Sequence, residues 1–182
     1  MIRLLKKPEF KISVVGLNKD GLNYLEQIFL SFFFTGLSPI ASGTISSILA
    51  CLIYYFPLGR NFYFLIFLSL STYLLGIKPS QKAEKFLGKD PSFVTIDEAS
   101  GMWLTMASPF IIANIYYVFI CFVCFRFFDI VKVFPSNYFD KRKGGFGIMT
   151  DDIFAGIYAN ICSHLIWIGL SWFPIFKHFF NN

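Results

Sequence analysis

Long apolar stretches are the feature that most restricts what this chain of 182 residues can fold into. A helix needs about 20 mostly apolar residues to cross the ~30 Å hydrocarbon core of a bilayer. Four stretches approach that length, and a fifth is shorter and carries charge near its start: 43–57, 62–77, 110–128 and 153–173, then 93–107. Hydrophobic residues make up 55% of the chain, above the ~45–50% of ordinary soluble domains. The sequence therefore predicts an all-α fold, a polytopic membrane helical bundle with about four to five membrane-embedded helices.

The chain is expected to form one membrane domain. No repeat or linker-like tract interrupts it, so we expect an N-terminal segment over 1–27, a membrane domain over 28–176 and a short tail over 177–182. The basic residues near the start resemble a signal peptide, but the first apolar run begins only near residue 28 and no cleavage site of small residues follows it. We therefore expect no cleavage.

Basic residues are clustered between the apolar stretches. The segments 1–27, 78–92 and 132–150 contain five, four and four of the sixteen Lys and Arg residues. Cytoplasmic loops of membrane proteins carry an excess of such residues. The clusters thus predict that these three segments are cytoplasmic, and membrane orientation explains the net charge of +5 better than nucleic-acid binding.

Acidic residues gather at the ends of apolar stretches on the same expected side. Of eleven Asp and Glu residues, five lie there: Asp97, Glu98, Asp129, Asp151 and Asp152. A charge at the membrane centre costs roughly 2.5–3.5 kcal/mol on insertion scales, so such residues usually face a bundle interior or a polar cavity. We expect these five acids to converge on one site.

Several of these acids also have a purely structural interpretation. Thr95 and Glu98 have the spacing of a capping box, in which each side chain satisfies a free amide at a helix start. Asp151 and Asp152 follow a possible cap at Thr150, where a carboxylate suits the positive end of the helix dipole. Each of these motifs alone leaves the structural and functional interpretations equally open.

Cationic and hydroxyl side chains supply the other half of a possible phosphate site. Arg126, Asp129 and Lys132 are spaced as an ion-pair row on one helix face. Arg126 is also suited to a bidentate phosphate contact, and Lys132 to a point-charge contact. Thr44, in "SPIASGTISS", offers a hydroxyl near a predicted helix start, which is a common seat for anions.

Carboxylates in such numbers favour a metal. Clustered carboxylates repel one another unless a cation neutralises them. Oxygen ligands without an assembled His or Cys set are typical of Mg²⁺, which also keeps waters and substrate phosphate in its coordination sphere. The chain lacks the Cys-x5-Arg motif of phosphocysteine phosphatases and the Asp-x-Asp motif of phosphoaspartate enzymes. Metal-assisted hydrolysis is the chemistry that these residues favour.

Three blocks of sequence resemble a known family. "TGLSPIASGTISS", "TIDEASGMWLTM" and "FRFFDIVKVFPSNYFDKRKGGFGIMTDDIFAG" are similar, in order and spacing, to the signature blocks of the bacterial phosphatidylglycerophosphatase A family. The resemblance covers about residues 30–160. The chain has Ser42, Ser46 and Val133 where the family often has Pro, Gly and Pro, which affects loop geometry rather than charge.

The resemblance implies a Mg²⁺-dependent, multi-pass phosphatase of the bacterial cytoplasmic (inner) membrane. Its substrate would be a phospholipid in the bilayer, phosphatidylglycerophosphate, and its product phosphatidylglycerol, within phospholipid biosynthesis. The active site would face the cytoplasm. By position, the family's acidic residues correspond to Asp97, Glu98, Asp129, Asp151 and Asp152, with Arg126 and Lys132 as basic companions. We expect the five acids to hold the metal, and Arg126, Lys132 and Thr44 to bind the phosphate. Asp129 and Asp152 are the candidates for a catalytic role, and whether water or one of these two aspartates attacks the phosphorus stays open.

Three other interpretations stay open. The substrate could be another lipid phosphate, such as phosphatidic acid. A small ion transporter also buries acids in a bundle, but it favours mid-membrane positions and often contains inverted repeats, which this sequence does not display. A non-catalytic membrane scaffold has no need for acidic and cationic sites together.

Overall fold

The computed structural model describes residues 22–110 and 114–172. Within these ranges the chain forms seven α-helices and short 3₁₀ segments, without a β-strand. The all-helical fold is therefore confirmed. The expected N-terminal segment and C-terminal tail fall almost entirely outside the described residues, so those boundaries stay predictions.

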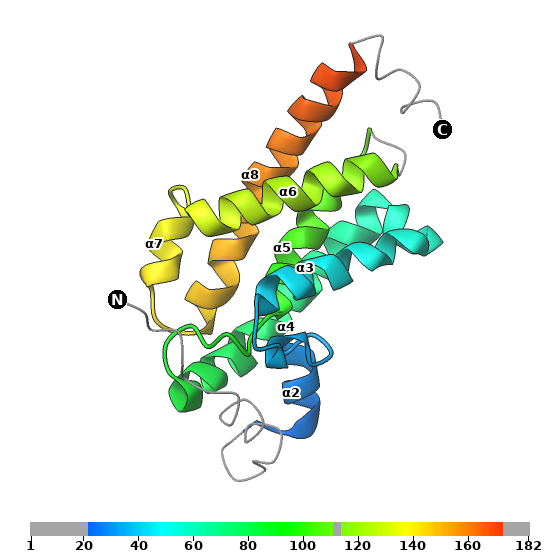
Figure 1. Ribbon diagram of the computed structural model, residues 1–182. Coiled ribbons are helices and arrows are strands. Elements are labelled where there is room, and N and C mark those ends of the chain that lie inside the picture. Colours follow the sequence, from blue (N-terminus) through cyan, green and yellow to red (C-terminus); the bar gives the residue numbers. More distant parts are fainter. Residues whose placement is uncertain (1–21, 111–113, 173–182) are drawn as a thin grey trace.

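Two helices are much longer than the rest, as Figure 1 shows. Helix α4 (Phe62–Leu87) has 26 residues and α8 (Gly145–Ser171) has 27, so each extends about 40 Å at a rise of 1.5 Å per residue. Asn61 caps the start of α4 by accepting from the Phe64 amide at 3.0 Å. Both helices are long and apolar enough to cross a membrane.

The remaining helices are short. They are α2 (Tyr24–Leu30), α3 (Ser42–Cys51), α5 (Ile96–Met106), α6 (Ile115–Val131) and α7 (Ser136–Lys141). The stretch 43–57 does not form one continuous α-helix, because α3 tightens into a 3₁₀ segment over Leu52–Tyr55 and a second one begins at Pro57. The stretch 93–107 contains a helix of only 11 residues, about 17 Å long. The number of membrane-embedded helices therefore stays a prediction.

The basic residues of segment 78–92 had indicated a loop, but only part of this segment is one. Helix α4 continues to Leu87, so Lys78, Lys82 and Lys85 lie on its last turns. Lys, Gln, Ala and Glu favour helix, which lets α4 extend past its apolar part despite Pro79. Lys82 forms an ion pair with Glu26 of α2 at 2.6 Å, and this pair connects the two helices.

Helices α5 and α8 cross in close contact. A Cβ added to Gly156 would lie 2.7 Å from the carbonyl oxygen of Gly101, and one added to Gly101 would lie 2.6 Å from that of Asp152. The Thr105 hydroxyl donates to the Gly101 carbonyl at 2.8 Å within its own helix and contacts the Gly156 carbonyl at 3.3 Å. Small residues permit this approach of two backbones, and it brings Asp152 beside α5.

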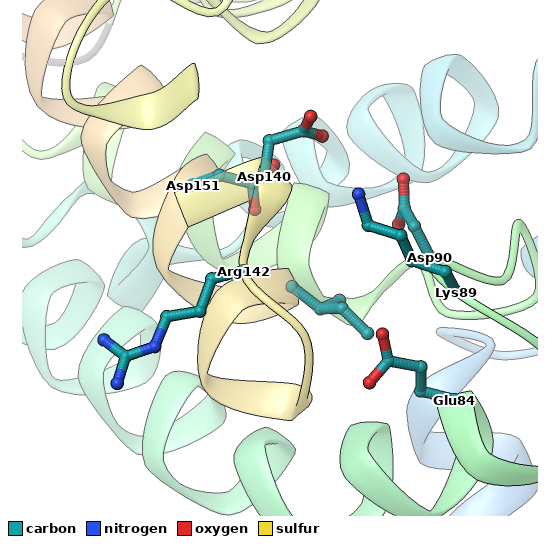
Figure 2. Close-up of a pocket in the computed structure, with 7 residues that line it drawn as sticks. Glu84, Lys89, Asp90, Asp140, Arg142 and Asp151 are labelled. Carbon is teal, nitrogen blue, oxygen red and sulfur yellow. The ribbon is translucent and has the colours of Figure 1, made fainter. Parts of the chain in front are cut away.

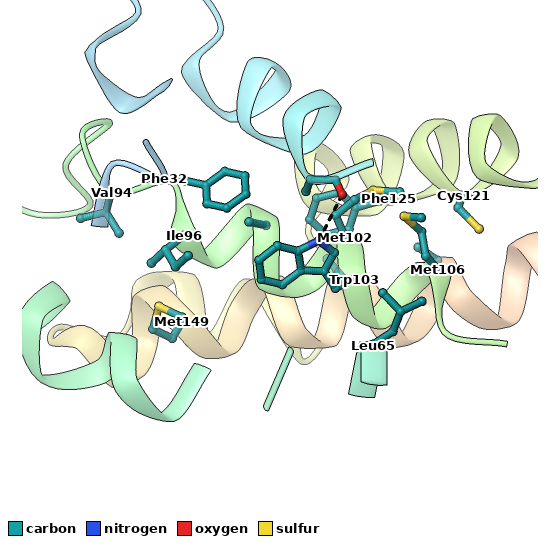
Figure 3. Packing of buried hydrophobic residues seen from close by; sticks show 14 of the residues in the cluster. Phe32, Leu65, Val94, Ile96, Met102, Trp103, Met106, Cys121, Phe125 and Met149 are labelled. Atoms are coloured by element: carbon teal, nitrogen blue, oxygen red, sulfur yellow. Dashed lines mark hydrogen bonds between the residues drawn. The ribbon is translucent and has the colours of Figure 1, made fainter. Parts of the chain in front are cut away.

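A buried apolar cluster fixes α3 and α6 against this pair (Figure 3). Phe125 of α6 and Met102 of α5 are fully buried. The Trp103 indole donates to the Ala50 carbonyl at 3.1 Å, which anchors α5 to the last turn of α3. Phe139 of α7 stacks on Phe154 of α8 with ring centroids 5.3 Å apart. These contacts hold the ends of several helices around one polar region.

Candidate active site

The start of α5 carries two of the predicted acids, and the capping box that the sequence left open there does not form. Thr95 is the N-cap residue, yet its hydroxyl lies 3.1 Å from the Thr35 hydroxyl and makes no capping bond. Asp97 accepts instead from the Glu98 amide at 3.0 Å. The Glu98 side chain extends toward α3, because its Oε1 atom lies 2.2 Å from where a Cβ on Gly43 would stand. Tertiary packing has drawn Glu98 away from the local cap.

The start of α8 also differs from the structural interpretation of the sequence. The helix begins at Gly145, six residues before Asp151, rather than after Thr150. Asp151 and Asp152 therefore lie in the second turn, where they are only 5% and 4% exposed. A carboxylate so deep in a bundle is not a helix cap. These two acids need partners from elsewhere in the fold.

Asp97, Glu98 and Asp152 form a compact three-carboxylate cluster. Each offers an oxygen atom, and the three atoms lie within 4.8 Å of one another. Within the described residues, no Lys or Arg forms an ion pair with any of the three, and the Glu98 Oε2 atom is buried without a hydrogen-bond partner. Close buried carboxylates need a neutralising cation. The all-oxygen donor set and the orphaned oxygen both fit a hard divalent ion such as Mg²⁺.

Arg126 and the start of α3 lie beside this cluster. The ion pair predicted between Arg126 and Asp129 is present at 2.6 Å. The Arg126 Nη1 atom lies 3.3 Å from a Cβ built on Gly43, so the guanidinium reaches the first turn of α3. No side chain caps that turn, in which Thr44 is half-buried. Free amides at a helix start and a guanidinium are both suited to a phosphate.

Lys132 has a different position from the one its spacing indicated. Helix α6 ends at Val131, and Lys132 is the C-cap residue, with a left-handed backbone at φ 49°. Its ammonium lies 2.6 Å from Asp140 and 2.6 Å from Asp151. Lys132 therefore bridges α7 and α8 instead of extending the row on α6, and it binds Asp151 apart from the three-carboxylate cluster.

The charge state of Lys132 follows from these contacts. Burial lowers the pKa of the ammonium group, but the charges of Asp151 and Asp140 raise it by more, so the net pKa lies above its ordinary value. Lys132 is thus a cation at any physiological pH, already paired with two carboxylates.

A small polar cleft opens beside Asp151 (Figure 2). Its wall includes Asp90, from the turn after α4, and Asp140, from α7. The sequence did not single out either residue, because each lies in a polar segment that also carries Lys, where an acid usually faces solvent. The one available signal for Asp140 was its place inside the third of the quoted sequence blocks.

Gly43 provides a test of the cluster that separates stability from activity. Gly43→Ala is expected to leave the free energy of unfolding within about 1 kcal/mol of wild type, since Ala favours helix and the atom it meets ends a flexible side chain. Because the new methyl group displaces the Glu98 carboxylate, the phosphate release that the family resemblance implies should fall by about 10- to 100-fold. Thermal unfolding and phosphate release measure the two effects. Wild-type activity in a folded Gly43→Ala protein would contradict a role for Glu98 in the site.

Comparisons with known proteins identify relatives of the chain. A protein of Bacteroides thetaiotaomicron, named as a candidate phosphatidylinositol-3-phosphatase, is 38% identical over 71% of this chain and 85% of its own length. The phosphatidylglycerophosphatase A of Escherichia coli K12 is 34% identical over 77% of this chain and 81% of its own. The phosphatidylglycerophosphatase A of Haemophilus influenzae is 42% identical over 54% of this chain and 60% of its own.

No solved structure gives a significant match to the chain. The sequence pattern of one family, described as phosphatidylglycerophosphatase A, matches residues 28–167. This range contains every predicted site residue, including the three-carboxylate cluster. The chain belongs to the phosphatidylglycerophosphatase A family.

Proposed function

We propose that this protein is a Mg²⁺-dependent lipid phosphatase that hydrolyses phosphatidylglycerophosphate to phosphatidylglycerol and inorganic phosphate. The observation that carries the proposal is the cluster of Asp97, Glu98 and Asp152, whose oxygen atoms lie within 4.8 Å of one another, with Asp97 and Asp152 buried and Glu98 half-buried. The family and the names of two relatives support the reaction and the substrate.

The three carboxylates would hold the metal ion. When bound, Mg²⁺ supplies Lewis-acid stabilisation of the charge on the phosphoryl oxygens. Arg126 and the uncapped first turn of α3, with the Thr44 hydroxyl, would bind the same phosphate from the other side. Charge stabilisation by fixed groups of this kind is the main catalytic task in phosphoryl transfer.

Hydrolysis requires one bond to form and one to break at phosphorus. The oxygen of water bonds to phosphorus, the bond from phosphorus to the lipid oxygen breaks, and the lipid oxygen gains a proton. Asp129 and Asp152 are the candidates to accept the proton of the attacking water. Asp129 forms an ion pair with Arg126 at 2.6 Å, so it lies next to the phosphate-binding site proposed for Arg126 and the first turn of α3.

The site is proposed to open at the cytoplasmic face of a bacterial inner membrane. The two long apolar helices α4 and α8 support membrane insertion. The basic residues Lys89 and Arg142 line a cleft together with Asp151, and Lys132 pairs with Asp151, as the positive-inside rule leads one to expect for a cytoplasmic surface. A site at the membrane surface also avoids lifting acyl chains out of the bilayer, at about 0.8 kcal/mol per CH₂.

A second lipid phosphate deserves a direct comparison. The Bacteroides thetaiotaomicron relative is named for phosphatidylinositol 3-phosphate, and it covers 71% of this chain at 38% identity. Phosphatidylinositol 3-phosphate is therefore one competing substrate to assay. Phosphatidic acid, the alternative that the sequence left open, is the other.

Metal dependence gives the decisive assay. Purified protein in mixed micelles with phosphatidylglycerophosphate is expected to release inorganic phosphate in Mg²⁺, to lose that activity in excess EDTA and to regain it when Mg²⁺ is restored. Undiminished release in EDTA would refute the metal requirement. If the protein released no phosphate from any of the three lipids, the enzyme proposal itself would be wrong.

A further inference from the structure

An apolar groove lies between α2, the turn that follows it, α4 and α5. Its volume is about 300 Å³, at the lower end of the ~300–1,000 Å³ of small-molecule pockets. Three of its residues, Leu25, Ile28 and Phe29, have the spacing of one helix face, so the apolar face of α2 forms one wall. The other lining residues are Phe32, Phe33, Thr72, Ile96 and Trp103.

The groove has a buried floor and an exposed rim. Its floor consists of Phe32, Ile96 and Trp103, which are buried and whose side chains Figure 3 shows. Its rim includes Leu25 and Phe33, which are 75% and 69% exposed. A ligand can therefore enter the groove from the surface of the protein and reach the packed interior.

An unusual turn builds both the floor and the rim. Phe32, Phe33 and Phe34 all have a left-handed backbone, at φ 41°, 56° and 67°, which is uncommon for bulky residues. The Phe34 amide donates to the Ser31 hydroxyl at 3.0 Å, which helps to hold this turn. The Phe32 ring packs edge-on against Trp103, with ring centroids 5.5 Å apart, whereas Phe33 points outward.

Both polar side chains of the groove wall already have hydrogen-bond partners. The Thr72 hydroxyl donates to the Leu68 carbonyl at 2.8 Å, within its own helix. The Trp103 indole donates to the Ala50 carbonyl at 3.1 Å. A polar ligand would lose its hydrogen bonds on entering the groove and gain none there, and water avoids apolar cavities for the same reason. The occupant that fits the groove is a hydrocarbon chain.

The groove adjoins the three-carboxylate cluster. Ile96, on the floor, directly precedes Asp97 and Glu98 in the first turn of α5. Consecutive helix residues project about 100° apart, so the groove and the cluster lie on different faces of one turn. A helix is about 10–12 Å across with its side chains, and the extended headgroup of phosphatidylglycerophosphate is at least as long. A lipid with its terminal phosphate at the cluster can therefore reach the groove with an acyl chain.

We propose that this groove binds one acyl chain of the lipid substrate while the terminal phosphate lies at the three-carboxylate cluster. The inference rests on the proposed phosphatase function. Lipid tails in a bilayer are as apolar as the groove, so moving the chain into it gains no hydrophobic free energy. The groove acts instead through van der Waals contacts that position the lipid. Hydrolysis should therefore depend on the length of the acyl chain.

Quenching of Trp103 fluorescence identifies the occupant. Replacing Trp167 and Trp172 by Phe leaves Trp103 as the one tryptophan, and because Trp103 is buried, a quencher must enter the groove to meet it. The probe is a phosphonate analogue of phosphatidylglycerophosphate with brominated acyl chains, in mixed micelles with Mg²⁺. Its phosphorus–carbon bond resists hydrolysis. Most of the Trp103 emission should be lost with this analogue and retained with brominated phosphatidylcholine at the same mole fraction.

Either of two quenching results would overturn the inference. Equal quenching by both lipids would mean that the groove holds any membrane lipid. No quenching by either would mean that something other than a lipid chain fills it, such as the N-terminal segment.

Thr72→Leu tests the groove from its wall. The larger side chain extends into the open space, and only a hydroxyl bonded within its own helix is lost. Because a change of this size in an apolar pocket has a large effect on binding, kcat/KM for dipalmitoyl phosphatidylglycerophosphate should fall about 10-fold. The rate for the dibutanoyl lipid, whose chains are too short to lie along the floor, should stay close to wild type. Quenching by the brominated analogue should be lost as well.

Controls separate the possible failures. Ser71→Leu makes a similar change at the adjacent, half-buried position of α4, outside the groove, and should leave both rates unchanged. Ile28→Phe fills the groove from α2 and replaces Thr72→Leu if that variant does not fold. An equal loss on long and short chains, or no loss on either, would overturn this inference while leaving the phosphatase intact. Failure of the wild type to release phosphate from any lipid would instead overturn the proposed function.

Discussion

Asp152→Asn is expected to lower kcat for lipid phosphate hydrolysis by about 100- to 1,000-fold, the usual cost of losing one group that stabilises transition-state charge. Asp152 is 4% exposed and shares the cluster with Asp97 and Glu98. Asn has nearly the same shape, but it removes one of the negative charges that would bind the metal. Inorganic phosphate release from phosphatidylglycerophosphate measures the loss.

Thermal unfolding gives the same prediction a readout independent of activity. Mg²⁺ that binds the folded protein should raise the unfolding temperature of wild type, and this increase should disappear in Asp152→Asn. Without metal, the variant should be at least as stable as wild type, because the amide relieves repulsion among three closely spaced carboxylates. Glu26→Gln is the matched control and should retain the Mg²⁺ effect. A persistent Mg²⁺ effect in folded Asp152→Asn would argue against the proposed ligand set.

Lys132→Met is expected to reduce the free energy of unfolding by about 3 kcal/mol. The ammonium of Lys132 lies 2.6 Å from both Asp140 and Asp151, and the Asp151 side chain is only 8% exposed. Removing the cation leaves a buried carboxylate without its partner, which costs much more than losing a surface ion pair. Chemical denaturation of the purified protein measures the change.

A double variant isolates the pair. Lys132→Met with Asp151→Asn should be more stable than Lys132→Met alone, because the second change removes the unpaired charge. The family resemblance implies instead that Lys132 contacts the substrate phosphate. Wild-type stability with strongly reduced activity in Lys132→Met would favour that role over the bridge between α7 and α8.

The convergence of acids was predictable from the sequence only in part. Asp97, Glu98 and Asp152 were each marked by their position at the edge of an apolar stretch, where an ionised group is costly unless it faces a polar interior. The same reasoning treated Asp151 and Asp152 as equivalent. Consecutive residues of a helix project about 100° apart, so Asp152 joins the cluster while Asp151 meets Lys132.

A local sequence motif did not predict the structure where tertiary contacts were stronger than the local interaction. Thr95 and Glu98 have the spacing of a capping box, but Thr95 contacts Thr35 and Glu98 extends to α3 beside Gly43. A capping interaction contributes only about 1 kcal/mol, so the packing of α3, α5 and α6 readily overrides it. Asp90 carried no signal and Asp140 only its place in the third sequence block, since what brings both to Asp151 is the path of the chain around the ends of α4 and α6.

The helical class, the family and the chemistry of the candidate groups follow from the sequence alone. These properties depend on composition, on the length of the apolar stretches and on motifs along the chain. Which charges meet depends on the folded structure: it forms the three-carboxylate cluster, the bridge from Lys132 to Asp140 and Asp151, and the cleft beside Asp90. The physical reason is that electrostatic energy depends on distances in space. Those distances are set by contacts such as the crossing of α5 and α8 at Gly101 and Gly156, between residues far apart in the sequence.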